Sequence, residues 1–311
     1  MKTNTKKIIS ALPLLAFVFI TASCATTDFI AEAMLSTNDA TVSAIGGAVK
    51  SINKATENFT PENEYYIGRS VAAAVVSKYP VKKVSKKVTD YLNNVCTSLT
   101  VNSALPYLYK GYYVAVLDSD EINAISTPGG HILVSEGLIK SCETEDALAA
   151  VIAHEIAHIQ LRHSIKVIES SRITSASMDT AKAVSFVTYD YLSKDNDSEF
   201  KDDFKKTASS LWDVQNALVG TLVDSGYSKN QEYDADKYAL QLMIDAGYNP
   251  KEMCKMLSSI EEKTSGGGWN KTHPSAKSRN EKVQNELKEL KYTATDETPR
   301  QKRFALIKNS L

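Results

Sequence analysis

Apolar residues return every three or four positions over most of the chain after residue 60, which is typical of amphipathic helices. The first predicted helix has Thr60 as its N-cap and Pro61 in its first turn, and it ends before Pro80. A second helix follows directly. Its core-facing side is predicted from the apolar residues Val84, Val88, Leu92, Val95 and Leu99.

Two short stretches break this helical spacing and predict strands. Residues 112–117 are aromatic and β-branched, and residues 132–134 follow a turn at Thr127-Pro128-Gly129-Gly130. Helical spacing resumes behind Thr144, a predicted N-cap that is followed by two acidic residues. We therefore predict an α+β fold, mostly α-helical, with a small β-sheet beside a helix that includes residues 150–163.

The helix predicted over residues 150–163 contains the pattern H-E-x-x-H at His154, Glu155 and His158. Residues four apart lie on one face of a helix, one turn apart, so both imidazoles can bind the same metal ion. Glu155 is placed to take a proton from a water molecule held by that metal. The pattern is short enough to arise by chance, so a third ligand decides its meaning.

A later helix offers that third ligand. Glu232 and Asp236 lie four residues apart on a helix that is predicted to end at Gly247 and Pro250. Alone, such a pair is typical of a solvated helix face. Together with the two histidines, Glu232 is expected to bind the metal and Asp236 to hydrogen-bond the outer nitrogen of a ligating histidine. Three protein ligands are typical of catalytic zinc, whereas structural zinc prefers four.

Four blocks of sequence occur in order between residues 60 and 290. They are Asn123-Ala-Ile-Ser-Thr-Pro-Gly-Gly-His-Ile-Leu-Val, the motif from His154 to His158, the stretch from Glu232 to Asp236, and Thr272-His-Pro-Ser with Arg279 soon after. In this order they resemble the HtpX-like and BepA/LoiP-like bacterial zinc metallopeptidases, which are gluzincins related to CaaX prenyl proteases. The resemblance implies a zinc metallopeptidase domain over residues 60–290, with Glu155 as general base and one Zn²⁺ per chain held by His154, His158 and Glu232.

Two residues of the last block have open roles. By resemblance, the loop that carries His273 reaches the active site, where His273 could donate to the oxyanion, occupy the fourth zinc position in a silent enzyme, or cap the structure. The preceding stretch, residues 265–270, is rich in glycine and predicts a flexible loop, which makes the second role physically possible. Arg279 could stabilise developing negative charge or form a surface ion pair on the last helix.

Two further histidines are not expected to bind the metal. His131 is predicted to be a surface side chain, because the zinc already has three donors. His163 follows His154 by nine residues, so a continuous helix would point it to nearly the opposite face. We predict a structural role for His163.

The N-terminal residues predict export. Residues 1–23 have the pattern of a signal peptide, with lysines before an apolar run from Ile8 to Ile20. The run ends in a stretch that resembles a lipoprotein cleavage box, with Cys24 as the lipidated residue; the alternative is a plain cleavable signal. Residues 24–59 are expected to form a lipid-anchored tether or a loosely packed helix. By resemblance to Gram-negative lipoproteins, the protein would face the periplasm from the outer membrane.

The remaining segments carry weaker predictions. The polar run 193–206 is predicted to be a solvated loop, with a lid as the alternative because it joins the two halves of the metal site. Residues 291–311 are predicted to be a charged C-terminal tail. The remaining cysteines fit either one disulfide with a free thiol or three buried small side chains, and they are Cys96, Cys142 and Cys254.

Charge excludes one class of partner. The net charge is −1 and no basic stripe is present, so we expect no nucleic-acid function. We predict a zinc-dependent endopeptidase that acts on polypeptides, and the resemblance implies unfolded or misassembled envelope proteins, which would add to an open strand edge. The alternatives are a lipoprotein chaperone or scaffold with little turnover, and a structural zinc protein if His273 supplies a fourth ligand.

Overall fold

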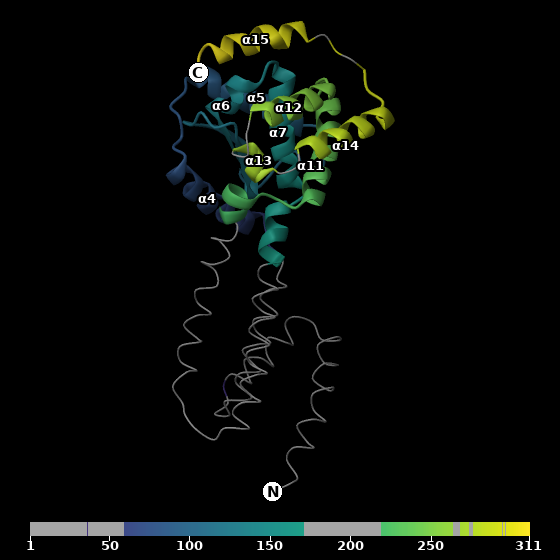
Figure 1. Cartoon of the computed structure of the whole chain (residues 1–311). Helices are drawn as coiled ribbons and strands as arrows, with labels where there is room; N and C mark the ends of the chain where they lie inside the picture. Colours follow the sequence, from purple (N-terminus) through teal and green to yellow (C-terminus); the bar gives the residue numbers. More distant parts are fainter. Residues whose placement is uncertain are drawn as a thin grey trace, which may run out of the picture. The chain divides into compact units, whose positions relative to one another are not determined.

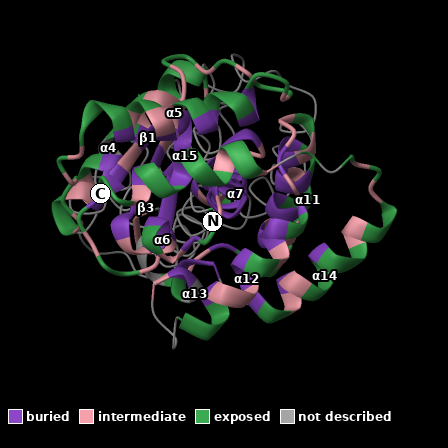
Figure 2. Cartoon of the chain, turned by 90° about the horizontal axis from the view of Figure 1, so that it is seen from above, coloured by how far each residue is buried: buried purple, intermediate pink, exposed green. Residues whose placement is uncertain are grey.

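The helix that carries the H-E-x-x-H pattern is α7 (Glu145–Gln160), and all of its residues are buried. In the computed structural model, other helices and a small sheet pack around it (Figure 1), and Figure 2 shows the visible part of α7 coloured as buried in the middle of the surrounding elements. A helix buried on every side has to be apolar on nearly every side, which is why alanine, valine and isoleucine fill most of α7. The spacing of apolar residues behind Thr144 predicted the helix but not its burial on every side.

The structure describes residues 36, 59–170, 219–263, 268–273, 276–293, 295 and 297–311. The described residues within Phe59–Ile168 and Trp212–Leu311 belong to one compact unit. Several predictions lie outside the described residues: the signal peptide over 1–23, Cys24, the tether over 24–59 apart from its residues 36 and 59, and the polar run 193–206.

The two ends of α7 are set locally. Thr144 is the N-cap, as predicted, and its side chain accepts a hydrogen bond from the Ala147 backbone N–H. The helix ends at Gln160, and Arg162 then adopts a left-handed backbone conformation with a φ of 56°. The prediction of one continuous helix to His163 is therefore wrong, and the chain changes direction just before that residue.

The sheet has three strands in the order β1-β3-β2. Strand β1 (Tyr113–Leu117) is parallel to β3 (His131–Ser135), and β2 (Ala124–Thr127) is antiparallel to β3. The first and third strands were predicted, whereas β2 was not. Strand β2 lies at an edge and packs against α7, so the sheet does stand beside the metal-site helix.

The turn between β2 and β3 is the 3-10 helix η1 (Pro128–Gly130). Gly129 has a φ of 75°, and a Cβ atom at this position would lie 2.4 Å from Tyr65 Cα. Only glycine fits both demands. This turn therefore packs closely against the first described helix, α4 (Pro61–Lys78), which also contacts β2 and β3.

The remaining helices largely follow the predicted pattern. Helix α4 (Pro61–Lys78) begins with a capping box at Thr60, and α5 (Lys86–Thr100) buries the predicted apolar side. The other helices are α6 (Glu136–Ser141), η2 (Thr221–Ser225), α11 (Lys229–Asp245), α12 (Lys251–Lys263), α13 (Trp269–Thr272), α14 (Ala276–Glu289) and α15 (Thr298–Lys308). This arrangement confirms the predicted α+β class, mostly helical with a small sheet.

The structure adds two elements that the sequence pattern missed. Trp269, in the stretch predicted as a flexible loop, begins helix α13 and is fully buried. Residues 291–311, predicted only as a charged tail, contain α15, which packs against α7 and α5. Phe304 and Ile307 of α15 are buried in the main core, so this charged segment also contributes apolar packing.

The cysteines and the helix lengths settle two smaller points. Cys96, Cys142 and Cys254 are free thiols, and the first two are buried. The disulfide considered from the sequence is therefore absent among these three residues. Within the described part of the chain, no helix has the length and apolar character needed to cross a membrane.

Candidate metal centre

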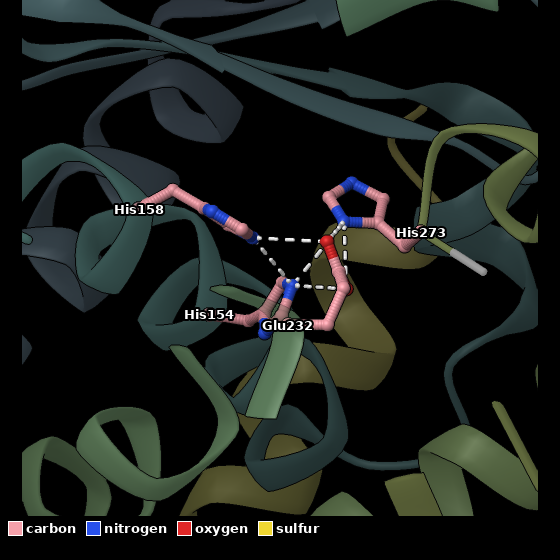
Figure 3. A group of neighbouring side chains, drawn as sticks. All are labelled: His154, His158, Glu232 and His273. Atoms are coloured by element: carbon pink, nitrogen blue, oxygen red, sulfur yellow. Dashed lines mark hydrogen bonds and ion pairs between the residues drawn. The ribbon is translucent and has the colours of Figure 1, made fainter. Parts of the chain in front are cut away.

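Four buried side chains from three parts of the chain meet beside α7. Helix α7 supplies His154 and His158, α11 supplies Glu232, and His273 directly follows α13. One possible ligand atom from each residue lies within 4.8 Å of the others, and Figure 3 shows the four side chains converging. The structure thus brings together the three predicted ligands, and it adds His273 as a fourth donor.

The separations of these donor atoms fit a zinc ion. His154 Nε2 lies 3.0 Å from His158 Nε2 and 3.4 Å from Glu232 Oε2, and His158 Nε2 lies 3.5 Å from Glu232 Oε1. His273 Nδ1 lies 3.3 Å from His154 Nε2 and 3.1 Å from Glu232 Oε1. Donors that are each about 2.0–2.1 Å from a tetrahedral zinc ion lie about 3.3 Å apart. Imidazole nitrogens and a carboxylate oxygen are also donors that zinc accepts, so these residues fit the metal.

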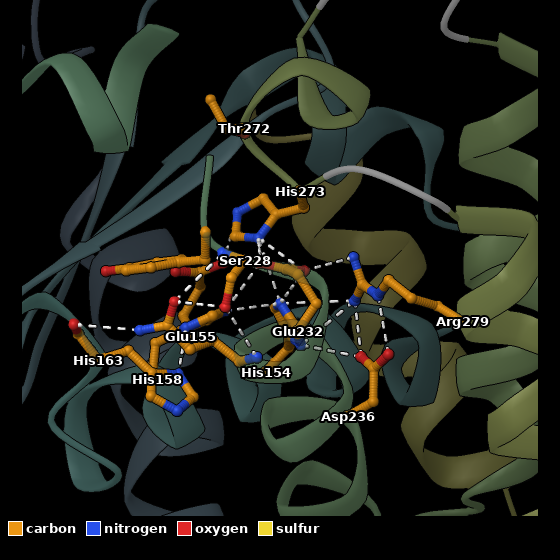
Figure 4. A network of polar contacts seen from close by, with 12 residues as sticks. His154, Glu155, His158, His163, Ser228, Glu232, Asp236, Thr272, His273 and Arg279 are labelled. Atoms are coloured by element: carbon orange, nitrogen blue, oxygen red, sulfur yellow. Dashed lines mark hydrogen bonds and ion pairs between the residues drawn. The ribbon is translucent and has the colours of Figure 1, made fainter. Parts of the chain in front are cut away.

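Asp236 holds the outer side of His154. Its Oδ1 lies 3.0 Å from His154 Nδ1, which is the contact predicted from its position one helical turn after Glu232. Arg279 in turn donates from Nε and Nη2 to the two Asp236 oxygens, at 2.7 and 2.6 Å (Figure 4). A bidentate pair of this kind fixes the orientation of the carboxylate, and through it the orientation of the histidine ring.

Arg279 lies on α14 and is 0% exposed. The surface ion pair considered for it is therefore wrong. Its Nη1 lies 2.8 Å from Glu232 Oε2, so its guanidinium joins the carboxylates of Glu232 and Asp236. The sequence alone could not show this burial, because it results from α14 packing against α11 and α12. In this arrangement Arg279 orients the carboxylates of both Glu232 and Asp236.

Charges around the site keep its carboxylates ionised. Burial, the largest single influence, would raise the pKa of Glu232, but the charges of His273 and Arg279 and hydrogen bonds from the two α7 histidines hold it well below its usual value. Burial also opposes ionisation of Asp236, yet Arg279 outweighs it and lowers the pKa of this carboxyl group. Both carboxylates can therefore bind cations at neutral pH.

The two α7 histidines differ in their electrostatics. Burial lowers the pKa of His158 to about 4, so its imidazole is neutral at pH 7. Burial acts in the same direction on His154, but the carboxylates of Asp236 and Glu232 outweigh it and raise the pKa to about 9. A metal ion would have to displace the proton from His154, as metal binding to histidine generally does.

Glu155 differs from the other carboxylates of the site. It is fully buried, and within the described residues neither of its oxygens has a hydrogen-bond partner. His273 Nε2 lies 3.3 Å from Glu155 Oε1, but not in hydrogen-bonding geometry. A buried charge without hydrogen bonds is costly. Its position beside a metal donor group therefore indicates a residue kept for chemistry.

The structure overturns the orientation predicted for His163. Because α7 ends at Gln160 and the chain turns at Arg162, His163 does not point to the opposite face. Its Nδ1 lies 2.8 Å from His158 Nδ1, and its side chain is buried. His131, by contrast, is half-buried at the start of β3, where it stacks on Tyr65 outside the four-donor group.

The match to a known family falls on this same part of the chain. The model of peptidase family M48 matches residues 86–287, which include every residue of the site described above. The chain belongs to peptidase family M48. Members of this family use zinc, so the predicted resemblance and the predicted cofactor are confirmed.

Individual M48 relatives match parts of the chain. The mitochondrial metalloendopeptidase OMA1 of Schizosaccharomyces pombe is 30% identical over 54% of this chain and 44% of its own length. The beta-barrel assembly-enhancing protease of Escherichia coli K12 is 23% identical over 63% of this chain and 36% of its own length. A protease HtpX homolog of Acaryochloris marina is 27% identical over 70% and 69%, respectively. The chain thus spans less than half the length of the first two relatives.

Two aromatic residues within the M48 match shape the site, and neither was predicted. Trp269 stacks on His273 with ring centroids 4.2 Å apart, and Tyr227 stacks on His158 at the same separation. Both side chains are buried. Trp269 directly follows a run of glycines and Tyr227 directly precedes the cap of α11. Their only sequence signal is this closeness to the histidine and glutamate donors.

Proposed function

We propose that this chain is a zinc-dependent endopeptidase in which His154, His158 and Glu232 hold the metal. The observation that carries the proposal is the buried carboxylate of Glu155, which lacks a hydrogen bond among the described residues while lying beside the donor group. A structural zinc site gains nothing from such a carboxylate. A hydrolase needs one, because a base must accept the proton of the attacking water.

The mechanism assigns each proton to an atom. When bound, zinc would supply Lewis-acid polarisation of the scissile carbonyl and of the attacking water. The Glu155 carboxylate accepts one proton from that water as the water oxygen adds to the carbonyl carbon. Glu155 then delivers the proton to the amide nitrogen as the C–N bond breaks, which releases an amine and a carboxylic acid. The buried surroundings of Glu155 favour this shuttle, because they exclude competing water.

His273 is proposed to act as a fourth ligand in the resting enzyme. Its Nδ1 lies in the donor group, and four protein donors would fill the tetrahedral coordination of a zinc ion and leave no position for a substrate carbonyl. His273 would have to withdraw before a peptide could bind. His273→Ala is expected to raise the hydrolysis rate while zinc stays bound by the other three residues. A rate unchanged or lowered in this variant would count against the resting-ligand role.

The proposed substrates are unfolded or misassembled proteins of the bacterial envelope. Among the described strands β2 pairs only with β3, so its other edge has no strand partner, and strand addition there would require the buried β2 residues to be uncovered. The Ala124 carbonyl oxygen on β2 lies 3.4 Å from His273 Nε2, which brings this edge to the metal site. A substrate bound through its main chain is recognised by being extended rather than by its sequence. The name of one relative, a beta-barrel assembly-enhancing protease, also supports an envelope substrate.

The proposed location is the periplasmic face of a bacterial membrane, in the outer membrane, with a lipid at Cys24 as the anchor. The support lies in residues 1–23, where lysines precede an apolar run that ends next to Cys24. Cys24→Ser is expected to move the protein from the membrane fraction to the soluble fraction of the periplasm. If the variant stays in the membrane fraction, the anchor lies elsewhere.

The test of the proposed activity is hydrolysis of an unfolded protein such as reduced, alkylated casein by the purified full chain. Zinc content is measured in the same samples, and Glu155→Gln is assayed beside the natural sequence. We expect one zinc per chain in both forms and cleavage by the natural form alone. Zinc in both forms without cleavage by either, even after His273→Ala, would instead support the chaperone or scaffold.

A further inference from the structure

The two ligand histidines of α7 have different partners on their outer nitrogens. His154 Nδ1 faces the Asp236 carboxylate at 3.0 Å. His158 Nδ1 faces another imidazole, with His163 Nδ1 at 2.8 Å. On the inner side, both Nε2 atoms point into the donor group and lie 3.0 Å apart. The two histidines therefore differ in the chemistry of their outer partner, which is a carboxylate for His154 and an imidazole for His158.

The positions of the protons on His158 and His163 follow from geometry. A hydrogen bond between two Nδ1 atoms needs one donor and one acceptor, so only one of the two rings carries a proton there. His158 must keep the lone pair of Nε2 for the metal, so as a neutral ring it carries its proton on Nδ1. His158 Nδ1–H then donates to His163 Nδ1, and a neutral His163 carries its own proton on Nε2.

We propose that His163 is a positioning residue of the metal centre, a neutral acceptor that fixes the tautomer and ring orientation of His158. This inference rests on the proposed zinc site. An outer hydrogen bond of this kind fixes the orientation of a metal-binding histidine and makes it a better ligand. His163 thus does for His158 what Asp236 does for His154.

Local structure holds His163 in this place. The left-handed Arg162, with a φ of 56°, interrupts the helix after α7, and His163 follows it within 2.8 Å of His158. Tyr227 stacks on the His158 ring, with centroids 4.2 Å apart and an interplanar angle of 16°. The Tyr227 hydroxyl lies 2.5 Å from Ser164 Oγ. The His158 ring is therefore held by Tyr227 on its face and by His163 at its outer edge (Figure 4 shows both histidines).

A neutral partner suits the charge of the site. Glu155, Glu232 and Asp236 already place three carboxylates in the buried centre, against the single guanidinium of Arg279. A fourth carboxylate at position 163 would add uncompensated negative charge in a desolvated place. An imidazole acceptor fixes the ring without that added charge.

The test compares zinc affinity in variants of the full chain, by competition with a chromophoric chelator. His163→Ala removes the acceptor and is expected to weaken zinc binding about 10–100-fold. His163→Gln, which can accept through its side-chain oxygen, is expected to recover most of that loss. His131→Ala is the matched control, because His131 lies outside the donor group, and its zinc affinity is expected to be unchanged.

Each outcome decides between distinct claims. Zinc binding by His163→Ala as tight as that of the natural sequence, with native circular dichroism, would overturn the inference and leave the zinc site intact. Absence of zinc from the natural sequence itself would overturn the zinc site, and with it this inference. If His163→Ala does not fold, two-bond ¹H–¹⁵N spectra of the natural zinc-loaded chain provide the answer. A His163 protonated on Nε2, with Nδ1 free to accept, is expected, and a His163 protonated on Nδ1 would contradict the proposal.

Discussion

The two ends of α7 carry buried carboxylates that look alike in sequence and differ in structure. At the N-terminal end, Glu145 accepts from Tyr91, Tyr248 and Arg303, and Asp146 accepts from the Asn249 backbone N–H and from Arg300. Every carboxylate oxygen there has a donor. Ten residues after Glu145, Glu155 is equally buried and neither of its oxygens has a hydrogen-bond donor among the described residues.

This difference in hydrogen bonding distinguishes the carboxylates of α7 that stabilise the fold from the carboxylate that we assign to catalysis. Buried arginine–carboxylate pairs occur both at the N-terminal end of α7 and beside its metal-binding end, since Arg300 binds Asp146 just as Arg279 binds Asp236 of α11. Such pairs alone therefore do not mark a functional site. What distinguishes the second half of α7 is the presence of imidazoles with converging nitrogens and of a carboxylate whose hydrogen-bonding capacity is unused.

The largest effect is expected from removal of the metal, which should abolish activity at one end of α7 and leave the ion pairs at the other end in place. Treatment with a zinc chelator is expected to reduce hydrolysis to the uncatalysed background, because the donor group no longer holds the ion. The pairs at the N-terminal end contain no metal donor, so the folded unit should persist, with a lower melting temperature. Hydrolysis that survives complete zinc removal would contradict the metal-dependent half of the comparison. Re-addition of zinc is the control and should restore the rate.

The next effect should appear only at the N-terminal end. Arg300→Met leaves the 1% exposed Asp146 with one donor in place of three, and we expect a loss of about 3 kcal/mol in the free energy of unfolding, measured by urea denaturation. Zinc affinity should not change. Lys86→Ala is the control, because it removes an exposed ion pair with Asp90 and should cost less than about 0.5 kcal/mol. Equal losses of unfolding free energy in the two variants would show that the burial of Asp146 does not strengthen its ion pair.

A third effect should appear only at the metal end. Asp236→Asn removes the carboxylate that faces His154 Nδ1, and zinc affinity is expected to fall about 10–100-fold. Chelator competition measures this change. Asp90→Asn, at an exposed position on α5, is the matched control and should leave the affinity unaltered. An unchanged affinity in Asp236→Asn would remove the role assigned to this contact.

The smallest effect is a pH dependence of the metal-free protein. The pKa of Asp236 is lowered from 3.8 and that of His154 is raised from 6.5 to about 9. The stability from the aspartate is therefore lost as pH falls below about 4, and that from the histidine is lost as pH rises toward about 9. The stability difference between the natural sequence and Asp236→Asn should peak near pH 5, at about 1–2 kcal/mol. A difference that is constant from pH 3 to pH 9 would show that the pair does not titrate as described.

Local signals made much of this site predictable. The cap at Thr144, the spacing of His154 and His158 and the spacing of Glu232 and Asp236 each depend on one helix, and all appear as expected. The short strand β2 was not predicted, because its four residues carry no alternation and are buried on both faces. Alternation cannot identify a strand that is buried on both faces.

The errors arose where distant segments meet or the backbone is unusual. The direction of His163 depends on the left-handed conformation of a single residue, Arg162, which no helical periodicity can reveal. The burial of Arg279 and Trp269 depends on packing between helices far apart in sequence. The packing of α15 was hidden because its charged residues were taken as a solvated tail, although two of them form pairs with buried carboxylates of α7.

The most direct test of the contrast within α7 is one experiment on two matched variants, Glu155→Gln and Glu145→Gln, in which hydrolysis of unfolded casein and urea unfolding are both measured. For Glu155→Gln we expect a rate lower by about 10²–10⁴-fold and undiminished stability. For Glu145→Gln we expect lower stability, by about 1–3 kcal/mol, with a near-natural rate for the folded fraction. A natural rate in Glu155→Gln, or a lost rate in a stable Glu145→Gln, would contradict the account.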